Sequence, residues 1–122
     1  EWLFDDLDAL NLVRRIAREL HDTLEQGLTV KISTFAYPGA GKTIAIGKPE
    51  GMVKMLCDPV TEEILGAHIV GHNATELLHE LLLARSAELL PEDIADMVHA
   101  HPTISEAVME AARGFAGKTI HG

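Results

Sequence analysis

The first part of the chain repeats apolar residues with the period of a helix. Apolar side chains recur at three- and four-residue steps between residues 5 and 26, and acidic residues stand at the start of this run. Such a stripe predicts an amphipathic helix, and Gly27 stands where a helix would end. We therefore expect residues 1–26 to form an N-terminal amphipathic helix and residues 27–122 to form the main domain. The stripe consists of Leu7, Leu10, Val13, Ala17, Leu20 and Leu24.

The middle of the chain predicts strands. Residues 28–34 (LTVKIST) alternate well enough to predict one strand. Residues 52–57 (MVKMLC) and 64–70 (ILGAHIV) predict the two strands of a hairpin. They are joined by the polar stretch DPVTEE at residues 58–63, whose composition is typical of a turn.

The last fifty residues predict three helices. The first opens with an Asn-x-x-Glu capping box at residues 73–76 and runs through a leucine-rich stretch to residue 90. The second is predicted over residues 91–100, because a proline is favoured in a first helical turn. The third is predicted over residues 103–115 and opens with the capping-box pattern TISE. This order predicts an α+β domain, in which an antiparallel sheet of three to five strands packs against helices.

Length and composition narrow the possible functions. A chain of 122 residues with 47% apolar residues predicts one domain with its own core. The net charge of −9 disfavours nucleic acid and anionic membrane as partners, and no apolar run approaches the ~20 residues of a membrane span. Cys57 is the only cysteine, which favours a reducing compartment such as the cytoplasm. Because the chain begins with Glu1, we also expect a fragment of a larger protein.

The stretch AYPGAGKT at residues 36–43 resembles a phosphate-binding loop. That loop works only when its Lys-Thr pair opens a helix whose amides bind phosphate. The following residues, IAIGKPEG, contain isoleucines, glycines and a proline, which disfavour a helix. We therefore predict a flexible turn between two strands, with Lys42 in solvent and no bound nucleotide. A helix over residues 43–48, with the amides of Gly41 and Thr43 facing a phosphate, would contradict this interpretation.

The seven histidines do not form a metal-binding pattern, since neither C-x-x-C nor H-E-x-x-H is present. Most of them are expected to be solvated or packed imidazoles, and we predict no metal site. This group consists of His21, His68, His72, His79 and His121.

The segment HAHPTISE at residues 99–106 carries a different combination. Glu106 near His101 would favour the imidazolium and fix the tautomer, which together give a base with an orienting acid. A structural alternative explains the same residues, with Glu106 as the capping-box acid and His101 as a turn residue before proline. The residues alone leave both possibilities open.

The longer string HAHPTISEA resembles the C-terminal signature of the pyridine nucleotide–disulfide oxidoreductases, the family of dihydrolipoamide dehydrogenase. The resemblance extends upstream through GKPEGMVKMLCDPVTEEILGAHIVGHNATELLHE and downstream to GKTIHG, and so covers about residues 27–122. It implies the interface (dimerisation) domain of that family. In this alignment TIAIGKPEG corresponds to a strand and turn before the hairpin.

The resemblance also implies roles for individual residues. His101 would be the active-site base and Glu106 its partner, with His99, Pro102 and Thr103 as supporting residues. The peptide bond before Pro102 would be cis, as is typical of the family. In these enzymes the histidine and the glutamate complete the dithiol–disulfide site of the partner subunit.

The resemblance finally implies what the chain needs from elsewhere. FAD and NAD are bound by other domains of the family, so this chain is expected to bind neither cofactor and to be inactive alone. We expect a homodimer, with leucines of residues 76–90 at the centre of its interface, completed by the missing FAD and NAD domains. The N-terminal helix is atypical of the family. An alternative is therefore a free-standing, non-catalytic dimeric module that uses the same fold for association or small-ligand binding.

Overall fold

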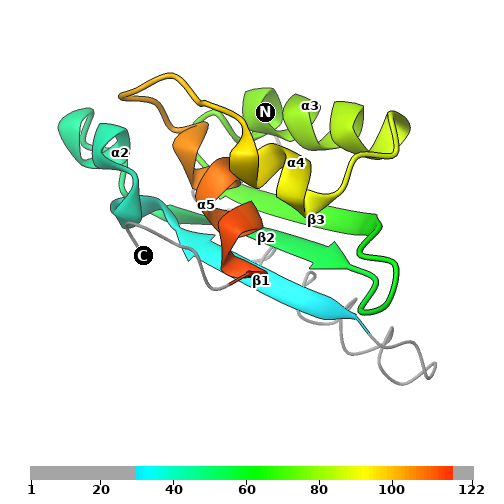
Figure 1. The fold of residues 1–122 in the computed structure, drawn as a ribbon. Helices are drawn as coiled ribbons and strands as arrows, with labels where there is room; N and C mark the ends of the chain where they lie inside the picture. The colour runs from blue at the N-terminus through cyan, green and yellow to red at the C-terminus, as the bar shows by residue number, and fades with distance from the viewer. Residues whose placement is uncertain (1–29, 117–122) are drawn as a thin grey trace.

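The computed structural model describes residues 30–116, and the helix predicted over residues 1–26 lies outside them (Figure 1). The described part is an α+β domain in which strands come first and the longer helices follow. Its elements are β1 (Lys31–Ala36), the 3-10 helix η2 (Tyr37–Gly39), α2 (Gly41–Ala45), β2 (Gly51–Cys57), β3 (Ile64–Gly71), α3 (Ala74–Ser86), α4 (Pro91–Asp96) and α5 (Glu106–Gly114).

The strands form one antiparallel sheet in the order β1-β2-β3. The predicted hairpin is present in β2 and β3, and His68 lies on its second strand as expected. The turn between them is closed by Asp58, whose Oδ1 accepts hydrogen bonds from the amides of Val60 and Thr61 at 2.8 and 2.9 Å. The predicted fold class and the predicted strand number are therefore confirmed.

The helices α3, α4 and α5 all lie on one face of the sheet (Figure 1). α3 packs on β3, whereas α5 packs on β1 and β2 and is covered in turn by α4. Alternate residues of β2 are buried, as expected for a strand with one face against helices. The resulting core joins strand and helix side chains, among them Val53, Met55, Ile69, Leu81, Val108 and Ala111.

The prediction that residues 43–46 are not helical is wrong. Gly41–Ala45 form the short helix α2, so the strand expected at the start of TIAIGKPEG is wrong, whereas a turn does follow at residues 46–47. The reason is a buried hydroxyl. Thr43 is fully buried and donates through Oγ1 to the carbonyl oxygens of Tyr37 and Ala40, at 2.7 and 2.9 Å. These bonds hold one helical turn that intrinsic propensity disfavours.

The same contacts argue against a phosphate site on this turn. The amide of Thr43, which a phosphate loop would need, donates instead to the carbonyl oxygen of Ala40 at 2.9 Å. The Thr43 hydroxyl is equally committed to the backbone. Lys42 is half-buried rather than fully solvated, which corrects a further detail of the prediction.

The first long helix differs from its prediction at both ends. The Asn73 side chain makes no capping hydrogen bond and the residue lies in the left-handed region at φ 60°, so the capping box expected there is wrong. α3 ends at Ser86 instead of residue 90. Glu88 turns into the left-handed region at φ 59°, and the amides of Glu88 and Leu89 donate back to the carbonyls of Arg85 and Ala84. This is a Schellman ending, formed without the usual glycine.

The next two helices are also shorter than predicted. α4 ends at Asp96, because Met97 takes an extended conformation (φ −76°, ψ 140°). α5 begins at Glu106, and its N-cap residue Ser105 makes no side-chain capping hydrogen bond, so no capping box opens this helix. The hydroxyl of Thr103 donates instead to the carbonyl oxygen of Ala100 at 2.6 Å. The segment between α4 and α5 is therefore extended, and it carries the candidate site.

Tyr37 closes the end of the sheet opposite the hairpin turn. Its ring is fully buried, and its hydroxyl donates to the carbonyl oxygen of His72 at 2.8 Å. The ring lies against Gly51 and Gly71, where an added Cβ would come within 2.9 and 2.5 Å of it. Both glycines therefore make room for this aromatic side chain.

Candidate active site

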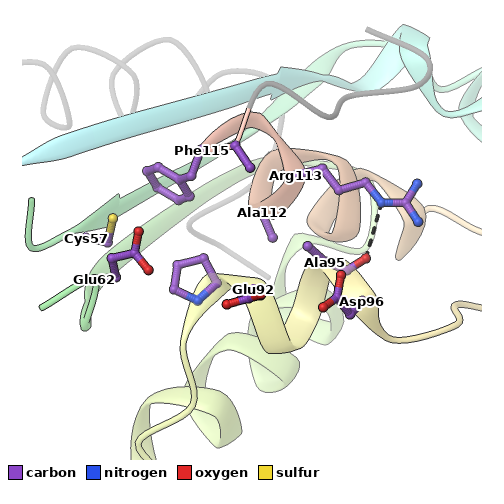
Figure 2. A pocket seen from close by; sticks show the side chains of 10 residues that line it. Cys57, Glu62, Glu92, Ala95, Asp96, Ala112, Arg113 and Phe115 are labelled. Atoms are coloured by element: carbon purple, nitrogen blue, oxygen red, sulfur yellow. Dashed lines mark hydrogen bonds between the residues drawn. The ribbon is translucent and has the colours of Figure 1, made fainter.

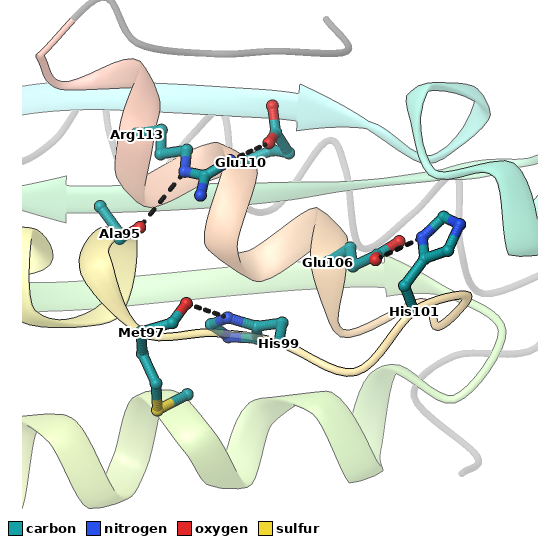
Figure 3. A network of polar contacts seen from close by, with 7 residues as sticks. All are labelled: Ala95, Met97, His99, His101, Glu106, Glu110 and Arg113. Carbon is teal, nitrogen blue, oxygen red and sulfur yellow. Dashed lines mark hydrogen bonds and ion pairs between the residues drawn. The ribbon is translucent and has the colours of Figure 1, made fainter.

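His101 and Glu106 form a hydrogen-bonded pair at the start of α5 (Figure 3). Nδ1 of His101 lies 2.7 Å from Oε1 of Glu106. The His101 side chain is 75% exposed, whereas the Glu106 side chain is only 12% exposed. The peptide bond between His101 and Pro102 is cis. The imidazole and the carboxylate are therefore within hydrogen-bond reach, and the imidazole is open to solvent.

The contact fixes which nitrogen of His101 carries a proton when the ring is neutral. An ionised carboxylate can only accept hydrogen bonds, so Nδ1 must be the donor. The lone pair then lies on Nε2, the other ring nitrogen, and remains available to accept a proton. An exposed imidazole in this tautomer, held by a nearly buried carboxylate, has the arrangement of a general base with its orienting acid.

The structural alternative for Glu106 does not describe its observed contact. A capping-box acid would bond back to the N-cap residue, but the Glu106 side chain bonds to His101 instead. Glu106 still lies in the first turn of α5, where the helix dipole favours a negative charge.

His99 occupies the opposite environment from His101. Its side chain is only 3% exposed, and both of its ring nitrogens have partners. Nδ1 lies 3.1 Å from the carbonyl oxygen of Met97, and Nε2 lies 2.6 Å from Oε2 of Glu80 on α3. The sequence predicted His99 near the site but did not predict its partner Glu80, because His99 and Glu80 are 19 residues apart in the chain. A tertiary contact between α3 and the segment after α4 leaves no local pattern in the sequence.

A second polar contact ties α5 to α4 (Figure 3). The Glu110 side chain is almost fully buried and accepts a hydrogen bond from Nη1 of Arg113 at 3.0 Å. Nε of Arg113 donates to the carbonyl oxygen of Ala95 at 3.2 Å. Because Ala95 is near the end of α4, this link fixes the two helices that flank the His99–Ser105 segment.

A cavity is lined by residues other than His101 and Glu106 (Figure 2). It has a volume of about 550 Å³, and its walls include Cys57, Arg113, Phe115 and the carboxylates of Glu62, Glu92 and Asp96. Burial raises the pKa of the Cys57 thiol, and this keeps the thiol protonated at neutral pH. Cys57 is therefore unsuited to act as a nucleophile.

Within the described residues, His68, His72 and His79 do not join a group that could hold a metal ion. Among residues 30–116, no group of three or more His, Cys, Asp or Glu side chains could hold a metal ion. His21 and His121 lie outside the described residues. In the same part of the chain, no helix is long and apolar enough to cross a membrane.

Comparison with known proteins gives a consistent family match. The sequence model of the pyridine nucleotide-disulphide oxidoreductase dimerisation domain matches residues 20–112. Dihydrolipoyl dehydrogenase of Corynebacterium glutamicum is 44% identical over 92 residues, which is 75% of this chain and 20% of that protein. The mitochondrial dihydrolipoyl dehydrogenase 2 of Arabidopsis thaliana is 44% identical over 97 residues, or 80% of this chain and 19% of its own length.

Solved structures agree on the fold. The crystal structure of LpdA from Mycobacterium tuberculosis aligns with a TM-score of 0.72 at 19% identity, covering 79% of this chain and 21% of that one. The HOCl-induced flavoprotein disulfide reductase RclA from Escherichia coli aligns with a TM-score of 0.69 at 20% identity, and the alignment covers 74% of this chain and 21% of the RclA chain. The chain thus spans about a fifth of the length of the relatives that it matches.

Proposed function

The chain belongs to the pyridine nucleotide-disulphide oxidoreductase family as a dimerisation domain, and from that premise we propose that His101 and Glu106 supply the acid–base group of a disulfide reductase. The observation that carries this proposal is the 2.7 Å contact between an exposed imidazole and a nearly buried carboxylate.

The proposed chemistry is proton transfer to and from sulfur. Nε2 of His101 would take the proton from one thiol of a dihydrolipoyl-type dithiol, because the thiolate and not the thiol attacks a disulfide. The new thiolate would attack one sulfur of the enzyme's disulfide, form a mixed disulfide and displace the second sulfur as a thiolate. The imidazolium can then return its proton to a leaving thiolate.

The proposed role of Glu106 follows from the charge that develops on His101. Once Nε2 is protonated, the ring is a cation, and the carboxylate 2.7 Å from Nδ1 stabilises it. The hydrogen bond also holds the ring plane, so that Nε2 faces outward throughout the cycle. Glu106 therefore acts through His101, without contacting the substrate.

The rest of the active site would come from other domains and from a second subunit. The family depends on FAD and NAD, but residues 30–116 contain no parallel strand–helix–strand unit of the kind that cradles a dinucleotide. The proposed contribution of this chain is therefore the proton-transfer group alone. The protein is proposed to act in the cytoplasm, a reducing compartment in which Cys57, the one cysteine of this chain, would stay a free thiol.

A homodimer is the proposed assembly, and the surface of the helical layer supports it. α3 exposes Leu82 and Leu83, and the segment after α4 exposes Met97 and Val98, which is 93% exposed. Monomeric proteins seldom leave a large contiguous apolar patch in water, and α3 and the segment after α4 lie side by side at the contact of Glu80 with His99. Val98 lies three residues before His101, so a partner that covered it would meet the candidate base.

A domain exchange tests the proposed function. Residues 27–122 would replace the corresponding domain of the Corynebacterium glutamicum dihydrolipoyl dehydrogenase, and its dehydrogenase activity would be measured. We expect an active chimaera, in which His101→Gln lowers kcat by about 10²- to 10⁴-fold, the usual contribution of a general base. His72→Gln, which changes an exposed histidine in the turn before α3, is the matched control and should leave kcat unchanged.

Two outcomes would contradict the proposal. Full activity in the His101→Gln chimaera would show that the histidine is not the base. A chimaera that folds, dimerises and binds flavin without turning over substrate would favour the alternative, a non-catalytic dimeric module.

A further inference from the structure

The segment between α4 and α5 is held at three separate points. Glu106 bonds His101, the Thr103 hydroxyl bonds the carbonyl of Ala100, and Glu80 bonds His99. The first two bonds are formed within the segment and the first turn of α5. The third is different, because it connects the segment to α3, an element that packs on the opposite edge of the sheet from β1.

The contact between Glu80 and His99 is short, and it is buried on the histidine side, whereas the Glu80 side chain is 25% exposed. Nε2 of His99 lies 2.6 Å from Oε2 of Glu80, and the His99 side chain is almost completely buried. The other ring nitrogen faces the carbonyl oxygen of Met97. A carbonyl oxygen and a carboxylate can both only accept. The two contacts can therefore both be hydrogen bonds in two ways: either both ring nitrogens of His99 carry a proton, or Nδ1 carries a proton and the carboxyl group of Glu80 donates one to Nε2.

Water does not readily replace the partner of a buried polar group. Breaking the contact would leave the Nε2 side of His99 unsatisfied in an enclosed environment, which is costly. The segment would have to move so that the His99 ring could reach solvent. His101 follows two residues later, so such a movement would carry its ring away from Glu106.

We propose that Glu80 is a positioning residue for His101, acting through the buried ring of His99. This inference rests on the proposed function, in which His101 is the base. Glu80 anchors the backbone on one side of His101 to α3, while Glu106 orients the ring from α5. The two carboxylates have different tasks, because Glu106 contacts the base itself and Glu80 fixes the chain that carries it.

The first test uses the isolated chain and nuclear magnetic resonance of the histidine ring nitrogens. In mildly alkaline buffer, the His101 ring of the unmodified chain should favour the tautomer with hydrogen on Nδ1, because that nitrogen donates to Glu106. Glu80→Ala should shift His101 toward the tautomer mixture of a free imidazole. Glu80→Gln should retain most of the bias, since its amide oxygen can still accept from Nε2 of His99. Glu76→Ala changes an exposed glutamate one turn earlier on α3 and should have no effect.

The second test places Glu80→Ala in the chimaeric dehydrogenase described above. We expect kcat to fall about tenfold to a hundredfold with KM unchanged, as when a support behind a catalytic group is removed. A general loss of stability would lower the melting temperature without changing the His101 tautomer, and that result would overturn the proposal. So would unchanged kcat and unchanged ring signals.

The two proposals fail in different ways. If His101→Gln abolishes activity but Glu80→Ala changes neither kcat nor the ring signals, then the positioning role is wrong and the proposed function stands. If Glu80→Ala shifts the tautomer of His101 but His101→Gln leaves activity intact, the contact positions His101 but the proposed function is wrong.

Discussion

Replacing Gly71 by alanine should destabilise the domain through the ring of Tyr37. A Cβ at this position would lie 2.5 Å from Cε2 and 2.8 Å from Cζ of Tyr37, and 2.9 Å from the carbonyl oxygen of Glu50. The ring cannot retreat easily, because Tyr37 is fully buried and its hydroxyl bonds to His72. Gly71 also has φ +133°, a conformation that residues with a side chain rarely adopt.

The two penalties can be added to estimate the loss. Backbone strain of this kind costs about 1–3 kcal/mol, and overpacking a well-filled core costs about another 1–3 kcal/mol. A loss of about 2–6 kcal/mol is a large part of the ~5–15 kcal/mol that stabilises a typical domain. With a denaturant slope of about 1.5 kcal/mol per molar urea, the unfolding midpoint should fall by about 1–4 M.

Gly66→Ala is the matched control, because Gly66 lies on the same strand. An added Cβ there meets no atom within 4 Å, and φ does not fall in the restricted range. We expect its midpoint to stay close to that of the unmodified chain or to rise slightly. Urea unfolding followed by circular dichroism would measure both variants. Equal midpoints for Gly71→Ala and Gly66→Ala would refute the reasoning that Tyr37 requires this glycine.

Two further predictions concern association and pH. Leu83→Asp changes a side chain that is 69% exposed and should give a folded monomer by light scattering at micromolar concentration, whereas the unmodified chain should have about twice the chain mass. Leu81→Asp is the contrasting variant, because Leu81 is buried in the core and its replacement should unfold the chain. If the unmodified chain is itself a monomer, the expected homodimer is wrong. Backbone hydrogen bonds from Thr61 and Val60 hold the pKa of Asp58 below its ordinary value. The ionised Asp58 carboxylate should therefore stabilise the folded domain fully at any pH above the pKa of an aspartate in the unfolded chain. This stabilisation should disappear as the pH falls through the lower pKa that Asp58 has in the folded domain. Asp58→Asn keeps an acceptor for the turn and should remove this part of the pH dependence of the melting temperature, and an unchanged pH dependence would show that Asp58 does not contribute.

The parts of the fold that the sequence predicts well are those governed by local rules. The hairpin of β2 and β3 follows from alternating burial and from a polar turn, both of which act over a few neighbouring residues. The pair of His101 and Glu106 could be proposed for the same reason, since five residues separate them on either side of a helix start. In each case the residues that interact are close in the chain.

The parts that the sequence did not predict depend on unusual local residues or on distant contacts. α2 forms because the buried hydroxyl of Thr43 satisfies two carbonyls, a condition that intrinsic helix propensity does not include. α3 ends early because Glu88 adopts a conformation in which glycine is usual, so the expected stop signal is missing. Glu80 could be recognised as the partner of His99 only after α3 was placed beside the segment that follows α4.

The outward direction of His101 has a genetic consequence. A base that points away from its own domain, as the proposed function requires, can be supplied to a site whose other parts belong to a different copy of the gene product. Two defective alleles, one without His101 and one damaged in the cofactor domains, would then complement each other. Their mixed dimer would contain one site in which neither defect is present. A cell that carries both alleles would therefore have some activity, although a cell that carries either allele alone would have none.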